Sequence, residues 1–120
     1  MKKISMALMA LSLCGCIDLG RVGMHPELKT VYFNGHQHAV QDCLYSAALQ
    51  QGFSLLSDDK MLAGIDRYNL EDKNHEVAAW VDISPFGKEQ TNADFFYASD
   101  APDVKSAVFA IIAQCENSLY

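Results

Sequence analysis

The sequence is poor in basic residues, and this shortage argues against two common classes of partner. Nine lysines and arginines stand against fifteen aspartates and glutamates in 120 residues, which gives a formal net charge of −6. Proteins that bind nucleic acid usually carry a basic face, and proteins that bind acidic lipids carry a basic patch. The acidic balance therefore indicates that neither nucleic acid nor an acidic lipid surface is the ligand.

Short motifs that mark common catalytic sites are also missing. The chain contains no Gly-x-Ser-x-Gly turn, no P-loop, no His-Glu-x-x-His metal motif and no glycine pattern of a dinucleotide site. Two acidic pairs, Asp58-Asp59 and Glu71-Asp72, lie in turn-like stretches, where carboxylates are usually solvated. We therefore expect a protein that is not an enzyme and that binds no cofactor.

Long apolar runs are absent except near the N-terminus. Met1-Lys2-Lys3 is followed by an uncharged stretch, Ile4 to Leu13, that is rich in Leu, Met and Ala. Its length matches the apolar region of a signal peptide, roughly 7–15 residues, and falls short of the about 20 that a membrane-spanning helix needs. The stretch ends in Leu13-Cys14-Gly15-Cys16.

This leader resembles the signal peptide of bacterial lipoproteins, in which a leucine and two small residues precede an invariant cysteine. The resemblance implies that residues 1–15 are removed and that Cys16 then carries a diacylglycerol thioether and an N-acyl chain such as palmitate. It also implies the outer membrane rather than the inner one, because Ile17 and not aspartate follows Cys16. The alternatives are an ordinary signal peptide or a buried N-terminal helix.

The resemblance covers the leader alone and gives no family for the rest of the chain. Cleavage would leave 105 residues, with seven basic residues against fifteen acidic ones and a net charge of −8. Residues 16–29 contain two glycines and a proline without a sustained apolar period, and we expect them to form a lipidated tether. Residues 30–120 are then expected to form one periplasmic domain.

Hydrophobic periodicity within this domain predicts an α+β fold. Apolar residues recur at helical spacing over Gln37–Gln51 and again from Val104 to Leu119, after Pro102 in the first helical turn. Strand-like segments are expected at 30–33, 53–56, 65–70, 76–83 and 94–98, with a hairpin loop over 87–92. We expect a small antiparallel meander of three to four strands, covered by the two helices.

Two cysteines remain after Cys14 is removed and Cys16 is lipidated. Cys43 and Cys115 both lie on the apolar stripe of a predicted helix. Disulfides persist in the oxidising periplasm, so we predict a Cys43–Cys115 bond that joins the two helices. The alternative is two separate buried thiols, since free cysteine packs as a small apolar residue.

The segment Gly35-His36-Gln37-His38 is the one cluster that looks like a metal site. On a strand, His36 and His38 would point to one face, with Asp42 nearby. Zinc needs three or four such ligands, and the pair straddles a predicted helix start, where positions i and i+2 diverge. We therefore regard the two histidines as weak metal candidates and expect no bound metal.

Aromatic residues suggest a surface for a partner. Alternation in the strand near 77–83 places Trp80 on the face opposite Val81 and Ile83. If the helices cover the aliphatic face, Trp80 would be exposed, with Phe96 (or Phe95) and Tyr68 beside it, as a possible partner surface. The alternatives are that the tether or the loop at 85–92 covers Trp80, or that the helices lie on that face.

These features predict a membrane-anchored periplasmic lipoprotein that serves as a non-enzymatic binding or structural component of the cell envelope. Its expected partners are the lipid bilayer, through the anchor, and another envelope protein. The alternative is an inhibitor or immunity protein that neutralises a toxin or lytic enzyme in the periplasm. A small acidic domain held by a disulfide would suit the capture of a basic enzyme.

Overall fold

A computed structural model describes residues 22–23, 25–58 and 65–119 of the chain. The expected leader, the lipid-attachment residue Cys16 and the first part of the predicted tether lie outside the described residues. The described part contains five strands and two helices. In chain order these are β1 (Glu27–Asn34), α2 (Gln37–Gln50), β2 (Ser54–Ser57), β3 (Asp66–Glu71), β4 (Val77–Phe86), β5 (Gln90–Tyr97) and α3 (Pro102–Ser118).

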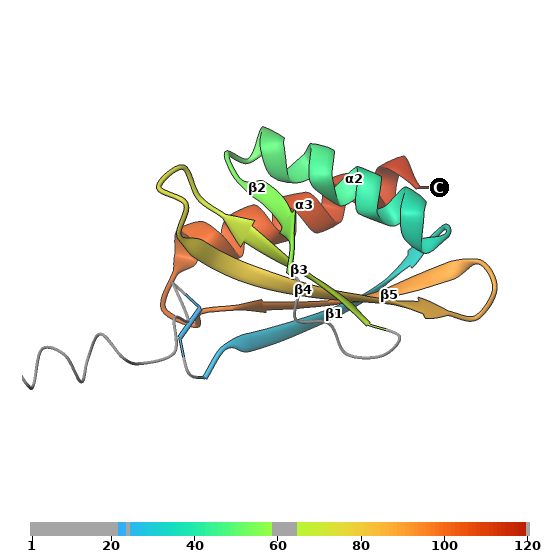
Figure 1. Cartoon of the computed structure of the whole chain (residues 1–120), viewed down its shortest axis with the longest axis horizontal. Coiled ribbons are helices and arrows are strands. Elements are labelled where there is room, and N and C mark those ends of the chain that lie inside the picture. Colours follow the sequence, from blue (N-terminus) through green and yellow to red (C-terminus); the bar gives the residue numbers. More distant parts are fainter. Residues whose placement is uncertain (1–21, 24, 59–64, 120) are drawn as a thin grey trace, which may run out of the picture.

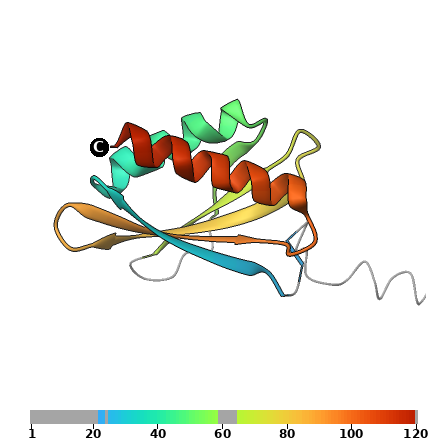
Figure 2. The ribbon, with the colours of Figure 1, turned by 180° about the vertical axis from the view of Figure 1, so that it is seen from behind.

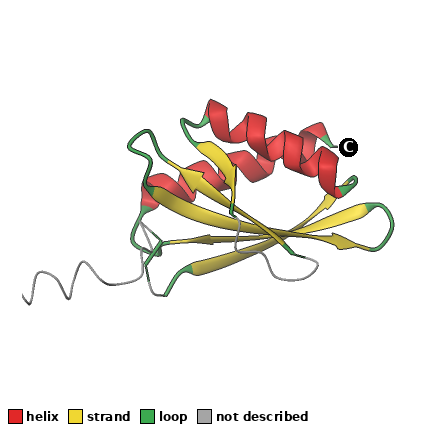
Figure 3. Ribbon diagram, in the orientation of Figure 1, coloured by secondary structure: helices red, strands yellow, loops and turns green. Residues whose placement is uncertain are grey.

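The strands form one antiparallel sheet with both helices packed on the same face (Figures 1 and 3). The strand order is β1-β5-β4-β3-β2, so β2 to β5 follow one another as a meander and β1 adds to the far side of β5. The α+β class and the antiparallel meander are therefore confirmed. The expected number of three to four strands is wrong, because the sheet has five.

The first strand is longer than the sequence pattern indicated. It pairs with β5 from Glu27 opposite Tyr97 to Asn34 opposite Gln90. Its first three residues lie in the segment expected to be tether, so the folded region begins before residue 30. The hydrogen-bonded pairing to β5, rather than a local apolar pattern, holds this polar start in the sheet.

The hairpin between β4 and β5 is also tighter than expected. Strand β4 runs to Phe86 and β5 begins at Gln90, so the turn occupies residues 87–89 instead of 87–92. Gly87 has a φ of 68°, a left-handed conformation that glycine adopts without steric cost. Thr91 and Asn92, which looked like loop residues, pair with Pro85 and Ser84 of β4.

Helix α2 ends at Gln50, one residue before the expected end, and a glycine follows closely. Gly52 has a φ of 84°, its N–H donates to Leu49 O at 3.1 Å, and the next N–H, of Phe53, donates to Ala48 O at 2.9 Å. This pattern satisfies carbonyl groups that a helix end otherwise leaves without partners. It turns the chain back toward the sheet, where β2 begins at Ser54.

The core lies between the sheet and the two helices, and a disulfide joins the helices to each other. Cys43 on α2 and Cys115 on α3 are bonded, with their Cα atoms 5.8 Å apart, which confirms the predicted pairing. Cys115 is fully buried. The largest side chains buried on this side include Phe33, Leu44, Leu70, Ile83, Phe95 and Ile111.

No helix within the described residues is long and apolar enough to cross a membrane.

Candidate functional site

The face of the sheet away from the helices is the candidate site. On β4 the backbone alternation buries Val81 and Ile83 against the helices. It turns Trp80, Asp82 and Ser84 to the opposite side, where all three are half-buried. We call this second side the uncovered face, since neither helix packs on it (Figure 1).

A row of large side chains crosses the uncovered face from one edge of the sheet to the other. The strand register aligns one residue from each of the five strands in the order β2, β3, β4, β5 and β1. These residues are Leu56, Asn69, Trp80, Phe96 and Leu28, and we call them the apolar row. The end residues Leu56 and Leu28 are 45% and 56% exposed. Trp80, Phe96 and Leu28 are therefore neighbours across three strands, and Asn69 separates them from Leu56.

Arg67 lies over the aromatic centre of this row. Its guanidinium carbon is 4.9 Å from the Trp80 ring centroid and 5.9 Å from that of Phe96. The two rings are themselves 6.4 Å apart and tilted. A cation over an aromatic face is attracted to the ring electrons, so this contact fixes the side chains of all three residues.

A paired carboxylate holds Arg67 in this position. Arg67 donates two hydrogen bonds to Asp82, at 2.7 and 2.8 Å. The hydrogen bond to Asp82 raises the pKa of Arg67, and this effect outweighs the opposing effect of burial. Arg67 therefore remains charged, and its forked geometry makes it a rigid support for the aromatic rings.

A second carboxylate on the uncovered face accepts a hydrogen bond from a neutral donor. Asp94 lies opposite Asp82 in the register and accepts a hydrogen bond of 2.8 Å from the Thr30 hydroxyl. Asp82 and Asp94 thus stand with the Arg67 guanidinium next to the apolar row, and the charge of Asp58 also acts on Arg67. Carboxylates therefore outnumber cations among these described groups, and negative charge of this kind attracts cationic groups.

Further aromatic side chains extend the face toward the β4–β5 hairpin. Tyr32 and Phe86 are 51% and 50% exposed, and their ring centroids are 4.6 Å apart. Asn92 pairs with Tyr32 in the register, and within the described residues its Oδ1 atom is buried without a hydrogen-bond partner. The same holds for Asn69 Oδ1, in the apolar row. Neighbouring side chains therefore cover the polar amides of this face.

Tyr68 does not belong to this surface. It is 8% exposed and packs in the core on the helix side, where burial raises its pKa. Tyr68 pairs with Val81, whereas its neighbour Asn69 pairs with Trp80. A shift of one residue along a strand reverses the face, so the expectation that Tyr68 lies beside Trp80 is wrong.

The sequence did not decide whether Phe95 or Phe96 lies beside Trp80. Because side chains alternate along β5, the two residues lie on opposite faces of the sheet. Phe95 is fully buried in the core, where its ring packs edge-on against Phe33 at 6.5 Å. Phe96 lies on the uncovered face beside Trp80. Of the two, only Phe96 is available to a partner.

The two histidines occupy different structural positions at the start of α2. His36 is the extended residue that precedes the helix, and His38 lies in its first turn, with Nε2 3.5 Å from Asp42 Oδ2. All three side chains are exposed. No group of three or more potential metal ligands occurs among the described residues. The arrangement is that of a surface pair on one helical turn, separate from His36.

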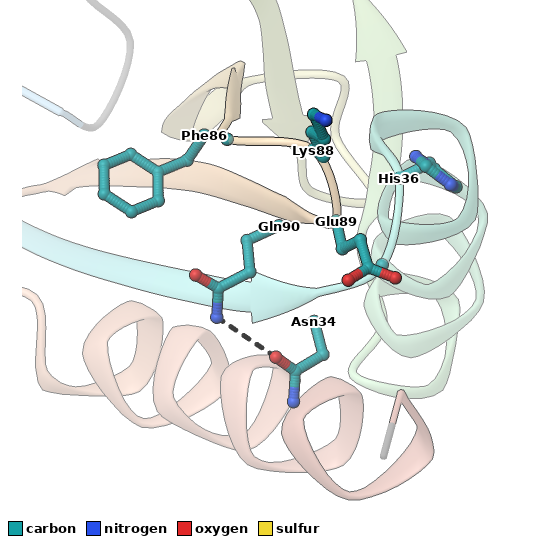
Figure 4. A pocket seen from close by; sticks show the side chains of 8 residues that line it. Asn34, His36, Phe86, Lys88, Glu89 and Gln90 are labelled. Atoms are coloured by element: carbon teal, nitrogen blue, oxygen red, sulfur yellow. Dashed lines mark hydrogen bonds between the residues drawn. The ribbon is translucent and has the colours of Figure 1, made fainter.

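An open depression lies beside His36, at the turn of the β4–β5 hairpin (Figure 4). Asn34 and Gln90 point toward each other there, and Gln90 donates a hydrogen bond of 3.1 Å to Asn34. The ionisable residues that line it, His36, Lys88 and Glu89, are all exposed. Catalytic sites usually contain a desolvated ionisable group, so this depression offers little for catalysis.

No protein-family model matches the sequence, and no curated protein matches it. A functional proposal therefore rests on the sequence, including the expected leader, and on the uncovered face.

Several residues of the uncovered face were missed from the sequence. Tyr68 and Leu70 are the buried residues of β3, and Arg67 precedes Tyr68. This alternation could have placed Arg67 on the opposite face of the strand. Leu28 had no such signal, because it lies in the segment that looked like a tether. Tyr32 and Phe86 meet only through the register of three strands, which a single sequence does not reveal.

Proposed function

We propose that this protein is a lipid-anchored, non-enzymatic binding component of the bacterial cell envelope, and that it holds another envelope protein on its uncovered face. The observation that carries the proposal is the apolar row, which reaches across all five strands on the side opposite the helices. Leu28 and Leu56 are exposed and Trp80 and Phe96 are half-buried, and apolar side chains that gather at a surface commonly mark an interaction site.

The residue types on the uncovered face support a role in protein binding. Tryptophan and arginine are among the residues that contribute most to protein–protein interfaces. Here Trp80 and Arg67 lie against each other at 4.9 Å, and Asp82 holds the guanidinium in place. A surface that is already ordered loses little conformational entropy when a partner docks.

The charge of the face indicates the chemistry of the partner. Asp82 and Asp94 outnumber Arg67, and the chain as a whole carries a net charge of −6. The complementary surface would present a lysine or arginine close to Asp94, surrounded by apolar side chains that cover Trp80 and Phe96. Opposite charge would also speed the encounter of the two proteins.

The leader supports a location at the periplasmic side of the outer membrane. If Cys16 carries the lipid, ten residues separate it from the start of β1 at Glu27. A chain of that length reaches at most roughly 35 Å. The uncovered face would then meet its partner close to the membrane surface.

A second candidate is an inhibitor or immunity protein against a periplasmic toxin or lytic enzyme. The observation that favours it is the excess of carboxylates beside the apolar row, at Asp82 and Asp94, which suits a basic enzyme. This candidate predicts that the captured partner loses enzymatic activity in the complex. The envelope component predicts a partner that is bound without inhibition.

Photo-crosslinking in intact cell envelopes tests the proposal. A photoreactive amino acid at Ser84, on the uncovered face, should give a discrete adduct that disappears when Trp80→Ala is added. The matched control is the same probe at Ser46, which is exposed on α2. Equal adducts from both positions, or an adduct indifferent to Trp80→Ala, would remove the uncovered face as the binding site.

A further inference from the structure

The outer edge of β1 is a long strand edge that the described structure leaves unpaired. β1 stands at the end of the strand order, and no other described strand runs along its outer side. Its eight residues include neither proline nor glycine, and the pairing to β5 has no irregularity. The opposite edge strand, β2, has four residues. Proteins usually shorten or interrupt such edges, because an open edge accepts another strand.

The backbone groups on this edge follow from the register. Gly35 N–H donates to Glu89 O at 2.7 Å, one position beyond the pair of Asn34 and Gln90. Opposite residues in an antiparallel pair alternate between hydrogen-bonded and non-hydrogen-bonded positions. The N–H and C=O groups of Leu28, Thr30 and Tyr32 therefore point away from β5, toward the open side.

We propose that this edge pairs with the same edge of a second copy of the chain, antiparallel and related by a two-fold axis at Thr30. In this register Leu28 lies opposite Tyr32 of the second copy, and Tyr32 opposite Leu28. Both side chains are more than half exposed in the single chain. One symmetry operation thus gives both of them an apolar neighbour, as a self-complementary two-fold interface requires.

Space for the added strand exists on the helix side as well. A groove runs between Lys29–Tyr32 of β1 and the residues Phe109, Ile112 and Ala113 of α3. Figure 2 shows β1 and α3 from this side of the molecule. Phe109 is 43% exposed at this groove, whereas Val31 is 6% exposed and stays in the core of its own chain. The groove therefore leaves the outer side of β1 accessible to an added strand.

Charge sets the conditions under which the pair forms. The two Lys29 side chains would be diagonal neighbours near the axis, and each Lys29 Nζ lies 5.8 Å from the Phe109 ring centroid of its own chain. Each copy also carries a net charge of −6. Added salt screens both repulsions, so the association strengthens as ionic strength rises.

The pairing does not depend on the proposed binding role of the uncovered face. It extends that face, however, because the apolar row of one copy ends at Leu28, which then meets Tyr32 of the other. The two proposals are tested separately: the crosslink at Ser84 reports on a different protein, and the experiments below report on the second copy.

A cysteine at the axis detects the pair directly. Paired residues at a hydrogen-bonded position have Cα atoms about 5.5 Å apart, within the range of a disulfide. The full-length Thr30→Cys protein should form a disulfide-linked dimer on mild oxidation. Ser84→Cys, far from the edge, and the wild type should not. Absence of the Thr30→Cys dimer, or an equal yield from Ser84→Cys, overturns the proposal.

A proline at the same position blocks the edge and leaves the sheet intact. Thr30→Pro removes an N–H that points outward, so the ladder to β5 keeps its hydrogen bonds. Thr30→Ala is the matched control, since both variants lose the hydroxyl bond to Asp94. Sedimentation should show a dimer for the wild type and Thr30→Ala and a monomer for Thr30→Pro. A monomeric wild type, or a Thr30→Pro protein that still dimerises, overturns the proposal.

Discussion

Arg67 connects the apolar and the charged parts of the uncovered face. It contacts the rings of Trp80 and Phe96 and donates two hydrogen bonds to Asp82. The side chain of Asp82 is only 16% exposed, so its negative charge is compensated mainly by Arg67 and little by solvent. Removal of the guanidinium would leave this carboxylate half-buried without its cation.

Arg67→Ala should therefore lower the free energy of unfolding by about 1–3 kcal/mol, the usual cost of leaving a buried polar group without its partner. Urea unfolding followed by fluorescence measures the change. The double variant with Asp82→Ala should lose less than the sum of the two single losses. Lys105→Ala is the control, because its 3.9 Å pair with Glu27 is exposed and should contribute at most about 0.5 kcal/mol.

Tyr68 gives a prediction about pH. Burial and, to a lesser extent, the charge of Asp66 raise the pKa of Tyr68 in the folded protein. Folding therefore favours the protonated phenol. The resulting contribution of Tyr68 to the free energy of unfolding is complete below the pKa of tyrosine in the unfolded chain, about 10, and is lost as the pH rises through the pKa in the folded protein. Tyr68→Phe should flatten the decline of stability above about pH 10. If Tyr68→Phe leaves the slope of stability against pH unchanged, as the control Tyr45→Phe on the exposed side of α2 should, the prediction is wrong.

At the scale of the elements, the disulfide joins the two helices that cover the sheet. Cys43 lies on α2 and Cys115 on α3, 72 positions apart in the sequence. In the chain-entropy model a bond that closes so long a loop restricts the unfolded chain strongly. The bond therefore contributes to stability chiefly through the unfolded state.

Replacing both cysteines by alanine should lower the free energy of unfolding by about 4 kcal/mol. Urea denaturation of the double variant and of the reduced wild type measures the effect, and the two should agree. A loss confined to the double variant would mean that the cost comes from the cavity at Cys115 rather than from the missing bond.

The elements with a sustained apolar pattern were the ones that the sequence predicted well. Helices α2 and α3 and the centre of β4 show regular spacing over many residues, and the structure places them within a few residues of the expected bounds. The first residues of β1 and β5 are mostly polar or charged, and pairing with neighbouring strands makes them part of the sheet: the start of β1 pairs with the end of β5, and the start of β5 pairs with β1 and β4. Such pairing is a long-range property that local pattern does not contain.

For the candidate site, too, local pattern predicted some features, and others depend on long-range strand pairing. Trp80 follows from the alternation within β4 alone, whereas its neighbours depend on how the strands align. Tyr68 was expected beside Trp80 because both lie on adjacent strands, but the register places Asn69 there instead. Leu28 was missed because its strand was not recognised. Faces of strands are readable from sequence, and neighbours across strands are not.

At the scale of the whole molecule, the proposed anchor and the uncovered face act together. A lipid on Cys16 would keep the domain within a short distance of the membrane and limit the partners it meets. It would also raise the local concentration of identical chains on one surface, which favours pairing through β1. The negative net charge opposes that pairing and favours basic partners instead.

The anchor predicts where the protein is found after cell fractionation. Cys16→Ser removes the thiol to which the diacylglycerol would be attached, so the protein should move from the membrane fraction to the soluble fraction. Cys14→Ser is the control, because the leader is expected to be discarded. Membrane association that survives Cys16→Ser would contradict a lipid anchor.

The proposed function requires that the uncovered face bind a partner through Trp80. Its most direct test is the affinity of the partner captured at Ser84, measured by calorimetry with the wild type, Trp80→Ala and Leu49→Ala. Leu49 is 51% exposed on α2 and gives an apolar truncation away from the face. We expect Trp80→Ala to weaken binding by about 30-fold or more, as for a central interface residue, and Leu49→Ala to leave it unchanged. An unchanged affinity for Trp80→Ala, or equal losses in the two variants, would contradict the claim.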